Sequence, residues 1–298
     1  MSAHPDVLCV GHASYDLIFS IDHHPQADEK TTANSFLGCG GGPAANAALA
    51  VARMGYSAAF AGYLGNDIYG QQHCRELIAE GVDTHLLQRG EAPTPLSAIM
   101  VKPDGARALV NYKSRHRCQP QAFPQGLSSI HPSVMLFDGH EPDLSAVLVE
   151  RARQLRIPMV LDAGSLHVGT EQLYRQVDYL VCSEKFATQI TADNGVEHSL
   201  DLLAESAPCV VITLGERGLV WRRGGESGCV PAFPVDAVDT TGAGDVFHGA
   251  FAAGVAGGYA WDDLLRLASA AGALCCTRLG ARPAMPTRQE IDAFLASR

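Results

Sequence analysis

The sequence predicts a doubly wound α/β protein, with a mostly parallel sheet between two layers of helices and a small β-sheet lid. Short apolar runs of strand length alternate with amphipathic segments of helix length along most of the chain. This alternation is typical of a parallel sheet covered on both faces. The 298 residues are 47% hydrophobic, which is ample for a large core. We therefore expect a single domain over residues 1–298.

Six apolar runs predict the buried strands, and three periodic segments between them predict helices. The strands are expected at residues 7–12, 58–65, 134–140, 158–164, 178–184 and 209–215. The helices are expected at residues 43–55, 67–81 and 144–156, with Pro43 in the first turn of the first one and Gly55 at its end. A further helix should run from Asp245 to about Gly257.

Two segments, at about residues 16–37 and 95–114, alternate between apolar and polar residues instead of running apolar. The second contains KPDGA, a strong hairpin signal. Alternation indicates one wet face, so we assign both segments to the lid. Ligands of open α/β sheets bind at the carboxyl ends of the strands, where such a lid would close over a substrate. Its exposed edge and partly apolar face favour a homodimer formed through the lid.

Composition excludes several classes of partner. The formal net charge of -10 argues against nucleic acid and against an anionic membrane surface. The nine cysteines form no CxxC pair, which favours reduced thiols over a disulfide framework or a zinc site. The N-terminal stretch lacks the pattern of a secretory signal, and GAFAAGVAGGYA is too short to span a bilayer. We expect a cytoplasmic protein.

The stretch DTTGAGDVFHGAF, residues 239–251, predicts a catalytic centre. Gly242, Ala243 and Gly244 leave the amides of a helix N-terminus open to a ligand, which makes an anion cradle. A carboxylate repels phosphate, so Asp245 beside the cradle makes sense as a general base for an attacking hydroxyl. The alternative is that Asp245 only interacts with the helix dipole in a glycine-rich helix start.

A second glycine-rich stretch, GCGGGPAANAALA at residues 38–50, lacks the Gly-Lys-Ser/Thr of a Walker loop. It also lies too far beyond the first strand for a dinucleotide fingerprint. Gly40 to Gly42 offer bare backbone at a helix start, and Asn46 presents an amide one turn later, which suits a polyhydroxylated ligand. The alternative is a flexible loop followed by a solvated asparagine.

With both motifs in this order, the whole chain resembles the ribokinase-like (PfkB-type) carbohydrate kinases. The resemblance implies that Asp245 is the catalytic base and that Gly242, Ala243 and Gly244 form the anion hole. It implies sugar contacts from Asp16, Gly41, Gly42 and Asn46. It implies ATP along the segment TLGERG, and we assign nucleotide binding to Ser183, Thr213, Gly215, Gly218 and Ser269.

The resemblance also implies Mg²⁺ with ATP, and a potassium ion held mostly by main-chain oxygens. The matching cation loops contain Asp239, Thr241, Cys275, Arg278 and Gly280, and end at Ala284. One departure concerns the family's Asn-x-x-Glu element, which positions magnesium. Ser183 and Phe186 stand at its two places, with Glu184 as a possible substitute.

We therefore expect an ATP-dependent phosphotransferase that phosphorylates a hydroxymethyl group of a sugar or related polyol. Within the family, stretches such as SAIMV also resemble bacterial sulfofructose kinases, for which Lys30 and Asn111 offer anion contacts, although His140 stands where an arginine is expected. The cluster KSRHR, residues 113–117, could contact an anionic sugar, but such a charged run is more often a solvated edge of the lid. A nucleoside kinase and a catalytically silent sugar sensor are further alternatives. His248, one turn beyond Asp245, is given no role.

Overall fold

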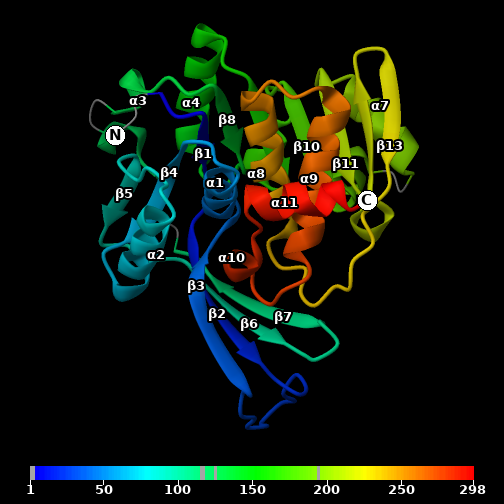
Figure 1. The fold of residues 1–298 in the computed structure, drawn as a ribbon. Helices are drawn as coiled ribbons and strands as arrows, with labels where there is room; N and C mark the ends of the chain where they lie inside the picture. The colour runs from blue at the N-terminus through cyan, green and yellow to red at the C-terminus, as the bar shows by residue number, and fades with distance from the viewer. Residues whose placement is uncertain (1–3, 115–117, 124–125, 193–194) are drawn as a thin grey trace.

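Nine strands form the central sheet, in the order β13-β12-β11-β10-β9-β8-β1-β4-β5 (Figure 1). The computed structural model describes residues 4–114, 118–123, 126–192 and 195–298. The strands are β1 (Val7–Val10), β4 (Ala58–Gly65), β5 (Leu87–Gly90), β8 (Val134–Phe137), β9 (Met159–Ala163), β10 (Tyr179–Ser183), β11 (Cys209–Thr213), β12 (Leu219–Arg223) and β13 (Glu226–Val230). Within this sheet the pairs β11–β12 and β12–β13 are antiparallel, and the other neighbouring strands are parallel. The predicted mostly parallel sheet is confirmed, while β5 and the β12–β13 hairpin were not predicted.

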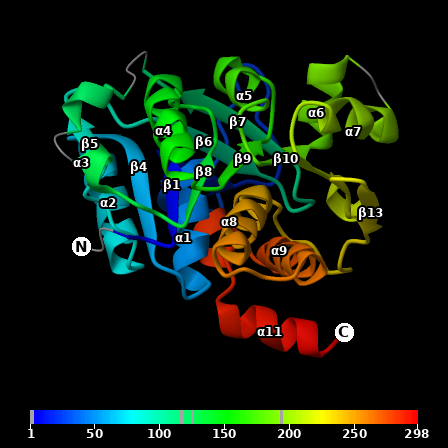
Figure 2. The same ribbon diagram turned by 90° about the horizontal axis from the view of Figure 1, so that it is seen from above.

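Helices cover both faces of this sheet, as the view from above shows (Figure 2). One hydrophobic cluster joins the sheet to α1 (Pro43–Arg53), α2 (Ile68–Ala79), α8 (Ala243–Ala256), α9 (Trp261–Cys275) and α11 (Arg288–Ala296). The cluster on the opposite face involves α3 (Gly126–Ser129), α4 (Pro142–Leu155), α5 (Val168–Leu173), α6 (Glu184–Thr191) and α7 (Val196–Ala204). A short helix, α10 (Ala281–Ala284), follows α9. The α/β/α layering is thus as predicted. Within the described ranges, no helix is long and apolar enough to cross a membrane.

A second, four-stranded sheet projects from the body of the molecule (Figure 1). Its order is β3-β2-β6-β7, formed by β2 (Ser14–Ser20), β3 (Ser35–Gly41), β6 (Leu96–Val101) and β7 (Arg107–Tyr112). Both alternating segments of the sequence contribute to it, and residues 102–106 form the β6–β7 turn. We call this sheet the lid sheet.

The glycine run before α1 was misread in part. Gly40 and Gly41 were predicted at a helix start, but they are the last two residues of β3 and pair with Tyr15 and Ser14 of β2. Only Gly42, with φ +94°, is the N-cap of α1. The small size of Gly41 is needed because an added Cβ would lie 2.2 Å from a carboxylate oxygen of Asp16. The glycines therefore bring a strand, rather than a loop, close to an acidic side chain.

Helices α1 and α8 pack closely through small residues. Gly249 of α8 lies against α1, where an added Cβ would be 2.6 Å from the carbonyl oxygen of Ala47 and 2.8 Å from the Cβ of Ala50. Backbones approach this closely only where side chains are small. This contact fixes the relative position of the N-terminal turns of the two helices, where the predicted catalytic residues lie.

Replacing Gly249 by valine is expected to destabilise the protein by about 1–3 kcal/mol, the usual effect of overpacking a well-packed core. The branched side chain has no space between α8 and α1. Chemical unfolding followed by circular dichroism measures the change. Gly225→Ala is the control, because an added Cβ there meets no atom within 4 Å. Equal unfolding midpoints for Gly249→Val and the wild type would contradict the packing described.

Candidate active site

The two glycine-rich motifs meet at one hydrogen bond. Asn46, in the first turn of α1, donates from Nδ2 to Oδ2 of Asp245, in the first turn of α8, over 2.7 Å. The two residues are 199 positions apart in the chain. The carboxylate of Asp245 is thus held at the point where both helices begin.

Asp245 has the electrostatic character of a base that works near neutral pH. Burial, followed by the nearby charge of Asp162, raises the pKa of Asp245 to about 7, while the hydrogen bond from Asn46 opposes the rise. An ordinary aspartate has a pKa near ~4 and is a much weaker base. A pKa close to the working pH is what general-base catalysis requires.

The segment before Asp245 presents an open helix N-terminus. Gly242 is the N-cap of α8 and adopts a left-handed conformation with φ +79°. No atom lies within 4 Å of a Cβ built on Gly244, so the first turn faces open space there. The amides of this turn have no partner within the helix and carry the positive end of its dipole, although that of Ala243 donates to the carbonyl oxygen of Thr240 over 3.3 Å. Gly242, Ala243 and Gly244 therefore offer an anion site next to the base.

Asp16 lies beside the same two helix starts. Its carboxylate covers Gly41 and accepts a hydrogen bond of 3.0 Å from Oγ of Ser14. Burial raises the pKa of Asp16, against the hydrogen bonds from Ser14 and Ser97. A carboxylate that is 6% exposed at the edge of an open site can accept hydrogen bonds from sugar hydroxyls.

The other predicted sugar contacts fall at different distances from this centre. Gly42 lies at the start of the helix that carries Asn46. Asn111 pairs with Ser97 across the lid sheet, and Ser97 pairs with Asp16, so the three side chains share one row on one face. Asn111 is exposed, further out along that row.

Arg282, which the sequence analysis missed, fixes the orientation of Asn46. Its Nε donates to Oδ1 of Asn46 over 3.1 Å, which leaves the amide nitrogen of Asn46 to face Asp245. The guanidinium is 4% exposed and is held by Glu76, at 3.0 Å, and by His73. A buried cation needs such partners. Arg282 therefore orients Asn46 so that its NH₂ group, a hydrogen-bond donor, and not its carbonyl oxygen faces Asp245.

Asp138, at the end of β8, is a second residue that was missed. Its Oδ2 accepts hydrogen bonds from the amides of His12 and Ala44, at 2.8 and 3.1 Å, and its Oδ1 accepts one from the amide of His140. The carboxylate thus satisfies a first-turn amide of α1. The signal was present in the sequence, since Asp138 follows directly on a buried apolar strand.

The residues proposed for an anionic sugar come together only in part, because Lys113 lies close enough for its charge to act on His140. His140 stacks on His167, with ring centroids 4.3 Å apart, and burial lowers the pKa of His140, so its imidazole is neutral at pH 7. Lys30 is exposed in the loop between β2 and β3. Of the cluster at 113–117, residues 115–117 lie outside the described ranges.

The predicted nucleotide residues lie mainly at the ends of two neighbouring strands. Ser183 ends β10 and pairs with Thr213, which ends β11, and the short 3-10 helix that follows begins at Gly215 and is capped by Gly218. Ser183 accepts a hydrogen bond from the amide of Phe186, and so caps α6. Ser269 lies elsewhere, half-buried on α9.

Glu184, the candidate substitute in the altered Asn-x-x-Glu element, is paired with another side chain. Its carboxylate accepts from Arg217 over 2.5 Å. Across the described residues, no group of three or more His, Cys, Asp or Glu side chains is arranged to hold a metal ion. The structure thus supplies no direct carboxylate cage for magnesium among them.

Four of the five predicted cation-loop residues come together. Asp239 accepts from the amide of Thr241 with Oδ1 and from that of Gly280 with Oδ2, both over 2.9 Å. Cys275 Sγ lies 3.7 Å from the carbonyl oxygen of Thr241. The side chain of Arg278 turns away and pairs with Glu290. Ala284 donates its amide to the Gly280 carbonyl.

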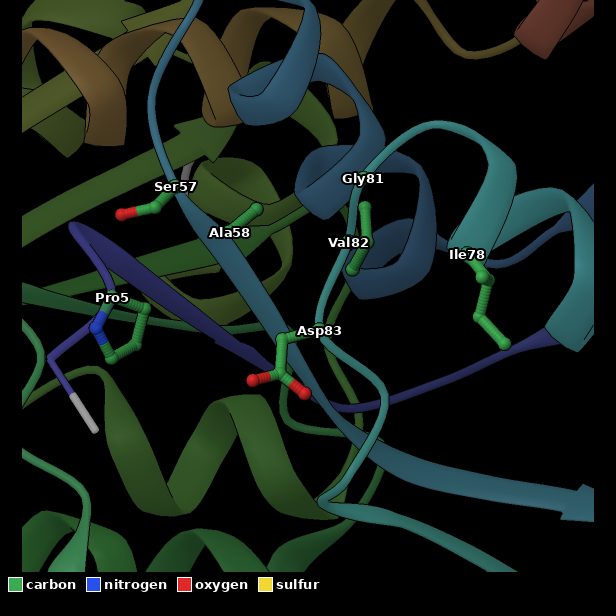
Figure 3. A pocket seen from close by; sticks show the side chains of 7 residues that line it. All are labelled: Pro5, Ser57, Ala58, Ile78, Gly81, Val82 and Asp83. Carbon is green, nitrogen blue, oxygen red and sulfur yellow. The ribbon is translucent and has the colours of Figure 1, made fainter. Parts of the chain in front are cut away.

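A pocket also lies at the other end of the sheet, where β1 and β4 begin (Figure 3). It is lined by Pro5, Ser57, Ala58, Ile78, Gly81, Val82 and Asp83. None of these is a predicted site residue. Asp138 and Thr213 lie at the carboxyl ends of their strands, whereas this pocket lies at the amino ends of β1 and β4.

Comparisons with known proteins agree with this geometry. Residues 4–288 match the pfkB family of carbohydrate kinases. The chain is 29% identical to the ribokinase of Bacillus subtilis over 294 residues, covering 98% of this chain and 99% of that protein. It is 27% identical to fructokinase-2 of Zea mays over 305 residues, covering 90% of this chain and 89% of that protein. The crystal structure of ribokinase from Thermotoga maritima has a TM-score of 0.87 at 27% identity, covering 98% and 99% of the two chains.

These relatives favour a sugar kinase over the alternatives of a sulfofructose kinase, a nucleoside kinase and a silent sensor. The fold, the joined motifs and the family match lead to the same conclusion. The chain belongs to the pfkB family of carbohydrate kinases and is an enzyme that phosphorylates a sugar hydroxyl.

Proposed function

We propose that this enzyme transfers the γ-phosphoryl group of ATP to a hydroxymethyl group of a neutral sugar, with Asp245 as the general base. The observation that carries the proposal is the hydrogen bond between Asn46 and Asp245, which joins the sugar-binding and catalytic motifs. A base held beside an open helix N-terminus can take a proton from the attacking hydroxyl. The amides of Gly242, Ala243 and Gly244 would then stabilise charge on the transferring group.

The sugar would lie between the lid sheet and the helix starts. Asp16 and Asn46 would hold its hydroxyls, Gly41 and Gly42 would let it approach the backbone, and Asn111 would contact it from the outer part of the lid row. ATP would lie along the ends of β10 and β11, near Ser183, Thr213, Gly215 and Gly218, with Ser269 contributing from α9. The neutral state of His140 supports a substrate without a strong anionic group.

Two ions complete the proposal. Mg²⁺ would neutralise the ATP phosphates, held by phosphate oxygens and water rather than by a carboxylate cage, because Glu184 is paired with Arg217. Potassium would bind main-chain oxygens of the loops that Asp239 ties together, which contain Thr241, Cys275, Arg278 and Gly280. The small charge density of K⁺ suits such neutral oxygen ligands.

We also propose a cytoplasmic homodimer formed through the outer face of the lid sheet. Phe36, Val110 and Tyr112 on that face are 59%, 65% and 54% exposed. Large apolar side chains gathered on a projecting sheet are typical of an interface. All nine cysteines are free thiols, which supports a reducing compartment.

A panel of sugars should identify turnover directly. We expect ADP release with ATP, Mg²⁺ and at least one neutral pentose or ketohexose, and a higher rate in potassium chloride than in tetramethylammonium chloride of equal ionic strength. Thermal stabilisation by a sugar without any ADP release would contradict the proposed reaction. Equal rates in the two salts would contradict the potassium site alone.

Asp245→Asn is expected to lower turnover at least ~100-fold, the lower end of what a positioned general base supplies. The Michaelis constant for the sugar should change much less, because the amide oxygen can still accept from Asn46. Arg282 holds that donor in place. Steady-state kinetics in the sugar separates the two constants. If the variant retains most of its turnover, Asp245 is not the general base and only interacts with the helix dipole.

The same base predicts the acid side of the pH profile. Asp245 acts when deprotonated, and its pKa in the free enzyme is raised to about 7 by burial and by Asp162. The value of kcat/KM should therefore fall as the pH drops through about 7. A profile that stays flat down to pH 5 would show that no group of raised pKa acts as the base.

Light scattering tests the dimer. The wild type should have the mass of two chains at micromolar concentration. Val110→Glu should be monomeric, because a dimer would have to bury the charge of the glutamate in the proposed interface. Ile78→Ser, which changes an exposed apolar side chain on α2, is the control and should remain dimeric. A monomeric wild type would refute the interface.

A further inference from the structure

His248 lies beneath the catalytic turn and contacts two carbonyl oxygens. It follows Asp245 by one turn of α8 and is 4% exposed. Its Nδ1 is 2.6 Å from the carbonyl oxygen of Gly244, the last residue of the anion hole. Its Nε2 is 3.1 Å from the carbonyl oxygen of Val181 on β10. The ring therefore bridges the first turn of α8 to the central sheet.

These two contacts determine how many protons the ring carries. A carbonyl oxygen only accepts hydrogen bonds, so each ring nitrogen must donate. A neutral imidazole has one N–H, and its other nitrogen would turn a lone pair toward a carbonyl lone pair. Both contacts are favourable only for the imidazolium, which has two N–H groups.

A counter-ion lies beside the ring. Oδ2 of Asp162, at the end of β9, is 3.4 Å from Nδ1 of His248, and the two side chains are 8% and 5% exposed. Burial opposes a charge on either member: with the charge of Asp138 it raises the pKa of Asp162 to about 8, and it lowers the pKa of His248 against the opposing effect of the contacts with Gly244 and Val181. The pair therefore keeps one shared proton at neutral pH, and the two carbonyls favour its location on the ring.

The charges of both members of this pair affect the pKa of Asp245. The charge of Asp162 raises the pKa of Asp245, and that of His248 lowers it. Other titratable groups of this region are Asp138, directly after β8, Asp16 on β2, and the thiols of Cys9, Cys182 and Cys275. Burial raises the pKa of each of these three thiols, so they are neutral at pH 7.

We propose that His248 is a positioning residue of this kinase, an imidazolium paired with Asp162 that anchors the Gly244 carbonyl to β10 and balances the charge next to the base. It holds the first turn of α8, and thereby the anion-hole amides, at a fixed place over the sheet. It also offsets the charge of Asp162, which otherwise makes Asp245 harder to ionise. The inference rests on the proposed role of Asp245 and adds a pair of residues behind it.

The protonation of His248 is measured on the unmodified enzyme. The protein contains 12 histidines, and the spectrum of ¹⁵N-histidine-labelled His248→Gln identifies the signals of His248 by their loss. We expect both ring nitrogens of His248 to be protonated at pH 7. A ring nitrogen without a proton at that pH would overturn the proposal. This measurement needs no substrate, so a failure to find a sugar with turnover would count against the proposed function and leave this test intact.

Two variants test the effect on the base, and their expected shifts have opposite signs. His248→Gln removes the positive charge and should move the acid limb of kcat/KM to higher pH by about one unit, a typical effect of a nearby charge. Asp162→Asn removes the negative charge and should move the limb to lower pH. Both changes should act mainly on kcat rather than on KM for the sugar.

His85→Gln is the matched control. His85 pairs with Asp83, which lines the pocket at the other end of the sheet. The pH profile of kcat/KM of this variant should match that of the wild type. A purely structural role would lower activity in both variants without opposite shifts. Acid limbs that coincide with the wild type in both variants would overturn the proposed charge balance. If either variant fails to fold, the ring spectrum of the wild type decides.

Discussion

The hydrogen bond between Asn46 and Asp245 is the contact on which the catalytic arrangement depends. It joins the first turns of α1 and α8, two helices whose close packing requires the small side chain of Gly249. Both first turns carry the positive end of a helix dipole, and the amides at the start of α1 are already bound by the carboxylate of Asp138 and the carbonyl oxygen of His12. The proposed sugar and phosphate sites are adjacent because two helix N-termini converge, and Asp245 lies where they meet.

The charges around this contact balance one another in a buried layer. Arg282 faces Glu76 and orients Asn46, Asp138 binds the amides at the start of α1, and Asp162 lies beside His248. Each carboxylate would raise the pKa of its neighbours if it were alone. Hydrogen-bond donors to these carboxylates and the buried guanidinium of Arg282 offset part of their charge, and the pKa of Asp245 is about 7. The protonation state of Asp245 thus depends on charged side chains from several helices and strands.

The fold could be predicted largely from the sequence, and the site only in part. The apolar runs and the alternating lid segments located the buried strands and the second sheet, because burial on two faces or on one face leaves different patterns. Gly40 and Gly41 were misassigned, since glycine reads locally as a turn although Gly41 makes room for Asp16 from a strand. Asp245 and Asn46 were predicted as site residues from the glycines before them, and the fold brings their side chains into contact. Asp138 and Asp162, at the ends of apolar strands, had a signal that was not used. Arg282 had none, because it lies 236 residues from Asn46 and its role exists only in the folded chain.

The most direct test of this account is a crystal structure with a turned-over sugar and a non-hydrolysable ATP analogue. The account predicts that the hydroxymethyl oxygen lies within hydrogen-bond distance of Asp245, with the γ-phosphate at the amides of Gly242 to Gly244 and Asn46 contacting a sugar hydroxyl. A sugar bound away from Asp245, or a γ-phosphate that leaves those amides without a ligand, would contradict it.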